Sequence, residues 1–343
     1  MSTRQEFHAE KYGLVIVDPG SFDIERRASG KGHRICFSSG EKITDKQLKA
    51  RVKALVIPPA WSNVKICVEE NGHIQATGRD EKGRLQYRYH DAWVNVRNAV
   101  KTERLLRFGR TLPKLRKRID KDLRRQEADR AMTAATAARL IDLSAMRPGH
   151  EKYAEDGGRG VASLRKDNLR IAKKTAVLKF VGKSKKSQVV TVNDKRLVRS
   201  LEKIRKGKGQ RLFRFRDEER RERILTANVL NEYLREAGAK KISAKDFRTF
   251  HGSAEALRFL ASETAEGLSE SKKKRLVAAA MRSVSEILRN TPTVARASYV
   301  HPEIVTAFEE DRLDETILKG RAREGLTKVE SALMRFLEEI ATR

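Results

Sequence analysis

A change in the spacing of apolar residues near Trp93 constrains the fold more than any other feature of the sequence. Before this point, short apolar runs and the strictly alternating segment Leu85–His90 predict β-strands. After it, apolar residues recur three and four positions apart, as along Phe247–Ala261, which is typical of a buried helix face. We therefore predict an α+β protein with a small β-rich N-terminal domain, residues 1–93, and a larger, mostly α-helical domain with a small β-sheet, residues 94–343.

The N-terminal domain contains several short segments with strand-like patterns. The expected strands are Leu14–Val17, Arg34–Phe37, Asn63–Val68, Gly72–Thr77 and Leu85–His90. A Gly- and Arg-rich connection separates the first two. A segment that begins at Thr44 predicts a short capped helix with Leu48, Val52 and Leu55 on one side.

The larger domain is interrupted by one compact β segment, at about residues 161–192. Its expected strands are Asn168–Ile171, Thr175–Val181 and Gln188–Val192. The polar stretch Gly182–Ser187 joins the last two strands as a hairpin tip. An alanine-rich helix precedes this sheet and ends near Leu143. From about Lys195 to the end, the chain is expected to be helical.

The charge balance indicates a polyanionic partner. Lys and Arg number 75 against 46 Asp and Glu, which gives a formal net charge of +29. Because the excess is spread over the chain and not confined to a tail, it points to a polyanion as the partner. Such binding should weaken steeply with salt, since each phosphate contact releases counterions. A basic protein without such a partner is the alternative interpretation.

The cysteine content and the N-terminal sequence indicate a reducing compartment. Cys36 and Cys67 are the two cysteines, and no CxxC motif is present, so no zinc site is expected. We expect no cofactor. The N-terminal residues lack the apolar core of a signal peptide. No run approaches the ~20 apolar residues that a membrane span needs. We expect a cytoplasmic, nucleoid-associated protein with no membrane contact.

One polar loop and the strand after it gather side chains suited to DNA contact. They are Arg79, Lys82, Arg84, Gln86, Tyr87, Arg88 and Tyr89. Arg and Lys can bind phosphates, Gln can reach a base edge, and Tyr can hydrogen-bond a phosphate. An exposed hairpin whose aromatic rings half-cover a core would have the same composition, so both interpretations stand.

A short segment near the C-terminus places a tyrosine on a capped helix. Thr291 is a good N-cap and Pro292 suits the first helical position, while Pro302 soon interrupts the helix. Taken alone, Tyr299 would be an ordinary surface residue, and His301 a cap or surface residue. A chemical role for Tyr299 depends on basic residues elsewhere in the chain.

Five motifs occur in an order that resembles a known family. They are Ile57-Pro-Pro-Ala-Trp61; Ala76-Thr-Gly-Arg-Asp80 with Gly83-Arg-Leu-Gln-Tyr-Arg-Tyr89; Phe180-Val-Gly-Lys-Ser184; Lys245-Asp-Phe-Arg-Thr-Phe250; and Asn290-Thr-Pro to Ser298-Tyr299. From about residue 13 to 310, the chain resembles the type IB DNA topoisomerases of the small bacterial and poxviral branch.

The resemblance implies relaxation of supercoiled double-stranded DNA without ATP or metal, through transient single-strand cleavage and a 3′-phosphotyrosyl intermediate. It also implies a monomer that wraps DNA as a two-domain clamp. The family's catalytic residues correspond to Arg147, Lys183, Arg248, Asn290 and Tyr299. Family positions that contact DNA correspond to Tyr153, Gln86, Tyr87 and Tyr89.

The residue types fit this chemistry for physical reasons. A phenol has a pKa near 10, and nearby guanidinium groups favour its ionised form. Planar Arg side chains suit the charge that develops on phosphate oxygens, Asn290 would donate to one of them, and Lys183 would protonate the leaving 5′-oxygen. Arg147 is followed by Pro148-Gly-His150, where the family usually has an apolar residue, Gly and a polar residue. Pro148 disfavours helix at Arg147.

A tyrosine recombinase is the main alternative, because that family shares the chemistry and a helical catalytic fold. Recombinases usually present a His three residues before the second Arg, whereas this chain has Lys245 before Arg248. The β-rich N-terminal region also differs from their common helical DNA-binding domain. A non-catalytic DNA-packaging protein would explain the charge but not the ordered motifs.

Overall fold

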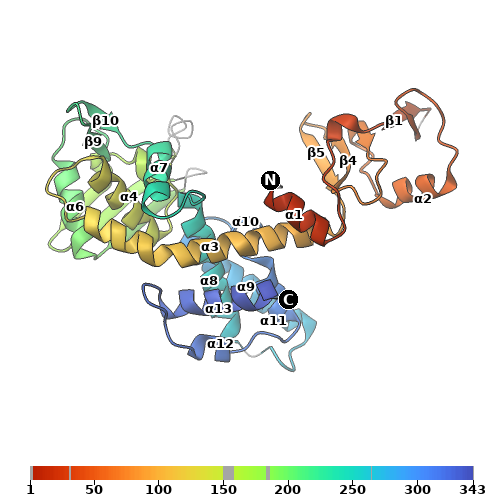
Figure 1. Ribbon diagram of the computed structural model, residues 1–343. Helices are drawn as coiled ribbons and strands as arrows, with labels where there is room; N and C mark the ends of the chain where they lie inside the picture. The colour runs from red at the N-terminus through yellow and green to blue at the C-terminus, as the bar shows by residue number, and fades with distance from the viewer. Residues whose placement is uncertain (1–2, 31, 150–157, 183–185, 264, 343) are drawn as a thin grey trace. The chain divides into compact units, whose positions relative to one another are not determined.

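The computed structural model divides into two compact units, Met1–Lys101 and Thr102–Arg343 (Figure 1). The structure describes residues 3–30, 32–149, 158–182, 186–263 and 265–342. Helix α3, Trp93–Asp122, begins at the predicted change of periodicity and continues from the first unit into the second. Each unit has a hydrophobic core of its own.

The first unit is built on a five-stranded antiparallel sheet in the order β2-β1-β3-β4-β5. The strands are β1 Ile24–Ser29, β2 Gly32–Phe37, β3 Ser62–Ile66, β4 Ile74–Arg79 and β5 Leu85–Tyr89. Helix α2, Lys46–Ala54, begins after its N-cap Asp45 and packs its apolar side on the core of the sheet. The expected short capped helix is confirmed.

Two expectations for this unit are wrong. Leu14–Val17 is not a strand, since only Val15 forms an isolated bridge, to Gly72. Conversely, β1 lies within the expected Gly- and Arg-rich connection. The alternating apolar pattern of β1 is hidden because Arg26 stands at a position where that pattern would have an apolar residue. Its guanidinium donates to the carbonyl oxygens of Ile57 and Trp61. A further helix, α1 Arg4–Lys11, was not expected either.

The second unit begins within α3 and continues with α4, Arg130–Ser144, which leads toward the predicted small sheet. That sheet is antiparallel in the order β6-β7-β8, with β6 Leu169–Ala172, β7 Thr175–Val181 and β8 Ser187–Val192. Helices α6, Lys195–Arg205, and α7, Ala227–Ala237, follow. In Figure 1, α4, α6 and α7 lie toward one end of α3.

The prediction that everything after Lys195 is helical is wrong at one place. A short hairpin of β9, Arg214–Arg216, and β10, Glu222–Ile224, lies between α6 and α7. Its strands are three residues long and mostly charged, so no apolar alternation marks them. A cross-strand ion pair between Arg214 and Glu222, at 2.8 Å, helps to hold them together.

The rest of the second unit is helical and surrounds α8, Ala244–Ala261. The remaining helices are α9 Glu270–Leu288, α10 Pro292–Ser298, α11 Pro302–Glu309, α12 Thr316–Lys319 and α13 Lys328–Thr342. The predicted apolar stripe of α8 is buried, with Phe247 and Phe250 packed edge-on against Phe108 of α3. Helices α9, α11 and α13 pack against α8, which therefore forms the centre of this region (Figure 1).

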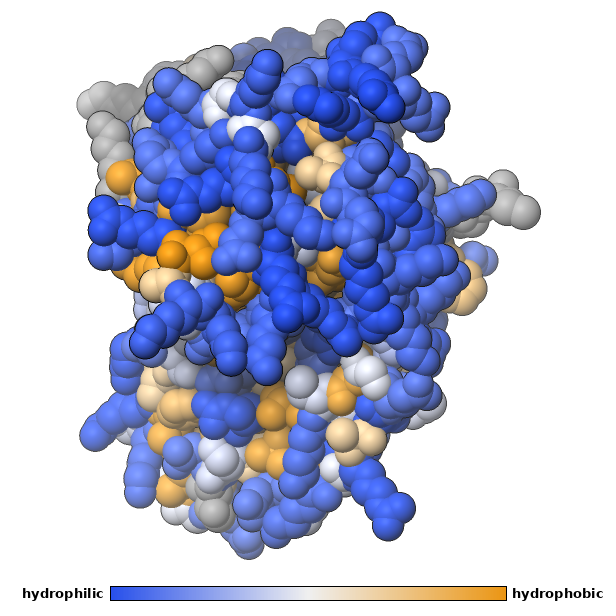
Figure 2. Space-filling view, turned by 90° about the vertical axis from the view of Figure 1, so that its left-hand side faces the viewer, coloured by the Kyte–Doolittle hydropathy of each residue, from blue (hydrophilic) through white to orange (hydrophobic). Residues whose placement is uncertain are grey.

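The surface agrees with the charged composition. Figure 2 shows a face that is mainly hydrophilic, on which apolar side chains gather in small patches. No helix within the described residues is long and apolar enough to cross a bilayer.

Candidate active site

The predicted short helix that carries the tyrosine is present as α10. Thr291 caps it by accepting a hydrogen bond from the Val294 amide at 3.3 Å, and Pro292 is its first residue. Tyr299 follows the last helical residue, and its amide donates to the Ala295 carbonyl at 3.0 Å. The half-buried Tyr299 side chain therefore lies at the C-terminal end of α10.

Arg248 of α8 lies directly against Tyr299. Its guanidinium carbon is 4.7 Å from the centre of the phenol ring, and its side chain is almost completely buried. It donates to the carbonyl of Leu288, at 2.9 Å, and to that of Ala145. These carbonyls end α9 and α4, where the helix dipoles favour a cation. No carboxylate in the described part of the chain forms an ion pair with Arg248.

Burial and neighbouring charge shift the pKa values of this pair. Burial, assisted by repulsion from Arg147, lowers the pKa of Arg248 to about 10, which still leaves it charged at neutral pH. Burial works to raise the pKa of Tyr299, but the charge and hydrogen bonding of Arg248 outweigh it. The charges of Arg147 and Lys245 act in the same direction, so the pKa of Tyr299 lies below its ordinary value.

Arg147 is brought to the same place by a tightly held non-helical segment. The Val161 amide donates to its carbonyl at 2.9 Å, and Gly149 has a positive φ of 82°. A Cβ on Gly160 would lie 2.5 Å from the Gly149 nitrogen, so glycine is required where these segments cross. The prediction that Pro148 disfavours helix at Arg147 is confirmed.

Asn290 follows α9, and its side-chain amide has no described hydrogen-bond partner. Its side-chain nitrogen and oxygen are buried, and neither has a hydrogen-bond partner among the described residues. Buried polar atoms are rarely left unpaired. Together with Arg248 and Arg147, Asn290 forms a site rich in donors, which suits a phosphate.

Three basic residues of this region were not among the predicted catalytic residues. Arg289 donates to the Ser144 carbonyl at 2.7 Å, and burial lowers its pKa. Arg159 and Arg289 line a small pocket together with Arg147 and Arg248. Lys245 contributes charge at Tyr299. Only Lys245 could have been found by sequence reasoning, because it lies one helical turn before Arg248.

Two predicted residues, Lys183 and Tyr153, lie outside the described residues, as does His150. The base of the hairpin that carries Lys183 is described. There the Gly182 amide donates to the Lys186 carbonyl at 2.8 Å. The Arg159 amide donates to the Val181 carbonyl at 2.7 Å, which ties this base to a residue that lines the small pocket.

The predicted DNA-contact residues of the first unit surround a loop organised by Asp80. Its carboxylate accepts hydrogen bonds from the side chains of Arg84 and Gln86, and from the Lys82 amide. Hydrogen bonding by Arg84 lowers the pKa of Asp80 and keeps it ionised. Arg79 donates to the carbonyl of the loop residue Gly83 at 2.8 Å. These hydrogen bonds hold the loop to itself and to the strands that flank it.

The strand after this loop presents its aromatic and basic residues differently. Tyr87 is exposed and stacks on Tyr89, with ring centres 5.9 Å apart, while Tyr89 stacks in turn on Trp93. Arg88 donates to the Leu55 carbonyl at 3.1 Å and pairs with Asp91. Arg79, Lys82, Arg84 and Tyr87 are exposed, whereas Gln86, Arg88 and Tyr89 are half-buried.

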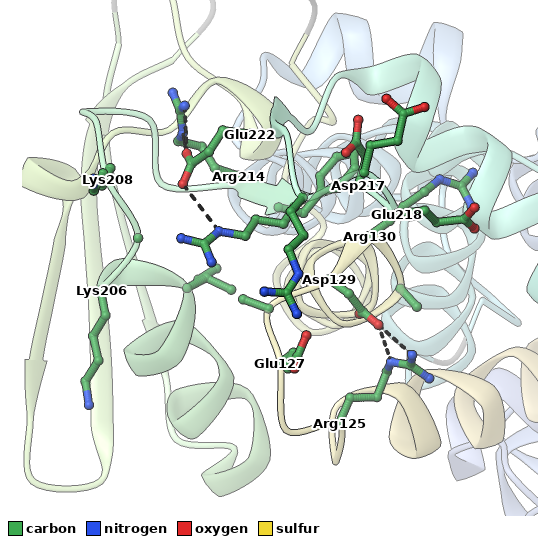
Figure 3. A pocket seen from close by; sticks show the side chains of 18 residues that line it. Arg125, Glu127, Asp129, Arg130, Lys206, Lys208, Arg214, Asp217, Glu218 and Glu222 are labelled. Atoms are coloured by element: carbon green, nitrogen blue, oxygen red, sulfur yellow. Dashed lines mark hydrogen bonds and ion pairs between the residues drawn. The ribbon is translucent and has the colours of Figure 1, made fainter.

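A large hollow of about 1230 Å³ lies away from the tyrosine. It is open to solvent and is lined by residues of both charge signs around the β9–β10 hairpin (Figure 3). Arg125 pairs there with Asp129, and Arg214 pairs with Glu222. None of the predicted catalytic residues lines it.

Metal-binding residues do not accompany these sites. In the part of the chain that the structure describes, no group of three or more His, Cys, Asp or Glu side chains is placed to hold a metal ion. Cys36 and Cys67 are both buried and free.

Comparison with known proteins agrees with the fold. Residues 91–319 match the family model described as Eukaryotic DNA topoisomerase I, catalytic core, and residues 33–80 match Bacterial DNA topoisomerase IB, N-terminal domain. A protein named DNA topoisomerase 1B from Acanthamoeba polyphaga mimivirus is 32% identical over 271 residues, which cover 77% of this chain and 80% of the relative. The DNA topoisomerase 1B of Vaccinia virus (strain Copenhagen) is 24% identical over 254 residues, covering 74% and 78%.

These matches and the tyrosine–arginine site define an enzyme of the DNA topoisomerase I class. The chain belongs to the type IB DNA topoisomerase family, in its small bacterial and poxviral branch. The expected fold, a β-rich N-terminal region followed by a mostly helical core with a small sheet, is confirmed.

Proposed function

We propose that this enzyme relaxes supercoiled double-stranded DNA by cutting one strand through Tyr299 and then resealing it. The observation that carries the proposal is the contact between Tyr299 and Arg248, a buried cation with no carboxylate partner among the described residues. Burying an uncompensated charge is costly. The cost is understandable if the charge is needed for an anion that arrives with the substrate.

In the cleavage step, the Tyr299 oxygen attacks the scissile phosphorus as its proton is lost to a nearby acceptor. A bond forms between that oxygen and phosphorus, and the bond from phosphorus to the 5′-oxygen breaks. Arg147 and Arg248 bind the non-bridging oxygens, where negative charge develops in the transition state. Asn290 donates a further hydrogen bond from an amide that has no other described partner.

The leaving 5′-oxygen needs a proton, and we assign that role to Lys183. A cation near other cations has a depressed pKa, which suits a lysine for general acid catalysis. The 3′-phosphotyrosyl bond conserves the energy of the phosphodiester, so attack by the 5′-hydroxyl can reseal the strand without ATP. Side-chain cations supply the positive charge, and we therefore propose a metal-independent reaction.

Between the two steps, the free 5′ end can rotate and release supercoils. We propose that the protein acts as a monomer whose two units form a clamp on the same duplex, in the cytoplasm at the nucleoid. The exposed residues Arg79, Lys82, Arg84 and Tyr87 would contact the duplex from the first unit. The half-buried Gln86, Arg88 and Tyr89, and Tyr153 of the second unit, would also contribute contacts.

Relaxation of a supercoiled plasmid in EDTA without ATP tests the proposal. We expect complete relaxation by the full chain. Tyr299→Phe should bind the same DNA but form no covalent adduct, because the ring and its packing are kept while the nucleophilic oxygen is removed. Failure of the wild-type protein to relax DNA that it binds would overturn the proposal. An adduct formed by Tyr299→Phe would show that another residue is the nucleophile.

A further inference from the structure

A single helix contacts both the side chain and the backbone of Tyr299. Arg248 of α8 lies over the phenol ring, and Ser253 lies a little more than one turn further along the same helix. Ser253 is fully buried. Its hydroxyl donates to the Tyr299 carbonyl at 3.1 Å and accepts from the His301 amide at 3.0 Å. It therefore spans the peptide groups on both sides of Val300.

A glycine next to Ser253 permits this close approach. A Cβ on Gly252 would lie 3.3 Å from the Tyr299 Cβ and 3.1 Å from the Leu288 side chain. Glycine inside a helix costs about 1 kcal/mol relative to alanine, so its presence here needs a packing reason. The packing of α8 against the Tyr299 segment supplies that reason.

His301 connects the same contact to α3. It is fully buried, and its Nδ1 accepts from the Glu303 amide at 3.2 Å, which caps α11. Because Nδ1 is an acceptor, Nε2 carries the proton in the neutral ring. Nε2 lies 2.9 Å from the hydroxyl oxygen of Thr102 on α3 and can donate to it.

We infer that Ser253, supported by His301 and Thr102, is a positioning group that holds the backbone of Tyr299 so that its phenol oxygen faces Arg248 and the arriving phosphate. The Tyr299 amide is held by α10 through Ala295, and its carbonyl by α8 through Ser253. With both sides of the residue held, the direction of the side chain is restricted before DNA binds. The inference rests on the proposed function, since it concerns the nucleophile of that reaction.

Positioning of this kind predicts a loss of rate without a loss of affinity. Ser253→Ala removes the hydrogen bonds at the Tyr299 carbonyl and the His301 amide, and misplacement of a nucleophile by about 1 Å can cost 10²-fold in rate. We expect single-turnover adduct formation on a nicked duplex to fall by about 10- to 100-fold. The dissociation constant for the same DNA should stay within about twofold, because Ser253 is buried and contacts no DNA.

Two further variants test the connection to α3. Asparagine is a good helix N-cap, so His301→Asn keeps an acceptor for α11 but is too short to reach Thr102. Thr102→Val removes the hydroxyl with little change of shape. Each should slow adduct formation by about 3- to 10-fold, and the double variant should be no slower than the worse single variant, because one hydrogen bond is lost in every case.

Ser200→Ala is the matched control, since Ser200 is also buried and bonds a carbonyl, that of Arg196, on α6. It should cleave at the wild-type rate. If the wild-type protein cleaves DNA and the Ser253→Ala and Ser200→Ala variants form the adduct at equal rates, the positioning role is wrong and the proposed function still stands. Affinity and thermal stability that fall in parallel with rate in both Ser253→Ala and His301→Asn would overturn it too. A wild-type protein that forms no adduct would overturn the proposed function, and the inference with it.

Discussion

Two arginines of the second unit, the half-buried Arg116 and the buried Arg248, show how differently the same charge can be used. Arg116 of α3 pairs with Asp142 of α4 and Glu330 of α13, each at 2.8 Å. Burial works to lower its pKa, but hydrogen bonds to the two carboxylates outweigh burial and raise it. Arg248 has carbonyl oxygens and a phenol ring as its described partners, and its pKa is lowered to about 10.

The difference separates a structural cation from one that we propose to be functional, although both lie next to α8. His251, one turn after Arg248, lies 3.6 Å from Asp142 and 3.8 Å from Glu330. Through His251, α8 thus joins a cluster in which Arg116 is compensated by Asp142 and Glu330. Arg248, on the same helix, has no carboxylate partner among the described residues, and we propose that it binds an anion. Glu330 brings the C-terminal helix α13 into the compensated cluster. This gives the last part of the chain, which has no recognisable motif, a structural role.

The largest expected effect is on stability, from breaking the compensated cluster. Arg116→Met leaves Asp142 and Glu330 buried without their main cation, and should lower the free energy of unfolding by about 3–5 kcal/mol. Urea denaturation at pH 7 measures this. Arg130→Met is the control, because Arg130 pairs with Glu236 near the surface and such pairs contribute about 0–1 kcal/mol. Equal losses for both variants would contradict the distinction.

Removal of Arg248, unlike removal of Arg116, should reduce the rate of cleavage more than it reduces stability. Arg248→Met should slow adduct formation by about 10²- to 10³-fold, because one donor to the transition-state charge is lost. Its unfolding free energy should fall by less than that of Arg116→Met, since the variant strands no buried carboxylate. Single-turnover cleavage and urea denaturation of both variants provide the test. Arg248→Lys should not restore the rate, because lysine lacks the planar fork; full restoration would refute that explanation.

Low pH should destabilise the charge cluster that contains Asp142 and Glu330. Burial works to raise the pKa values of Asp142 and Glu330, but the neighbouring His251 and the hydrogen bonds that Arg116 donates to both carboxylates lower both pKa values below their ordinary values. Carboxylates with lowered pKa values stabilise the fold above their unfolded pKa of about 4. That stability is lost as the pH falls below about 4 toward the lower folded values.

Glu330→Gln tests this pH dependence. It should lower the unfolding free energy by about 1–3 kcal/mol at pH 7, because a charged hydrogen bond becomes a neutral one. Its stability should also decline less steeply than that of the wild type between pH 5 and pH 3, about the range in which such a carboxylate titrates. Denaturation series at several pH values give both slopes. Parallel curves for the two proteins would mean that Glu330 does not contribute to acid sensitivity.

The sequence predicted the elements whose patterns are periodic. The apolar spacing along α8 and the alternation in β5 are visible because one face of each is buried. The strand β1 was missed because Arg26 fills an alternate position and satisfies its donors with carbonyls from far along the chain. The β9–β10 hairpin was missed because charge pairing across strands leaves no period-two apolar pattern.

The candidate site was predictable as a set of residues but not as a geometry. The family resemblance identified Arg147, Arg248, Asn290 and Tyr299 together with Lys183, and the structure brings the four described residues together from four segments. Ser253 was not identified, because its partners are backbone groups that carry no side-chain signature. His301 was expected to be a cap or surface residue; it is a cap, but a buried one.

The smallest expected effect concerns an exposed cation that influences the same phenol. Lys245 lies in the first turn of α8, and its charge helps to lower the pKa of Tyr299. Lys245→Ala should therefore move the pH dependence of adduct formation to higher pH. At pH 7 and low salt, the rate at saturating DNA should fall by about two- to fivefold, and the defect should shrink as salt rises, because exposed charges are screened. Arg147→Ala should move the profile further in the same direction, since its contribution is larger.

A Lys245→Ala profile that is unchanged at low salt, or displaced to lower pH, would contradict this assignment. Such a result would leave Arg248 and Arg147 as the cations that ionise the nucleophile.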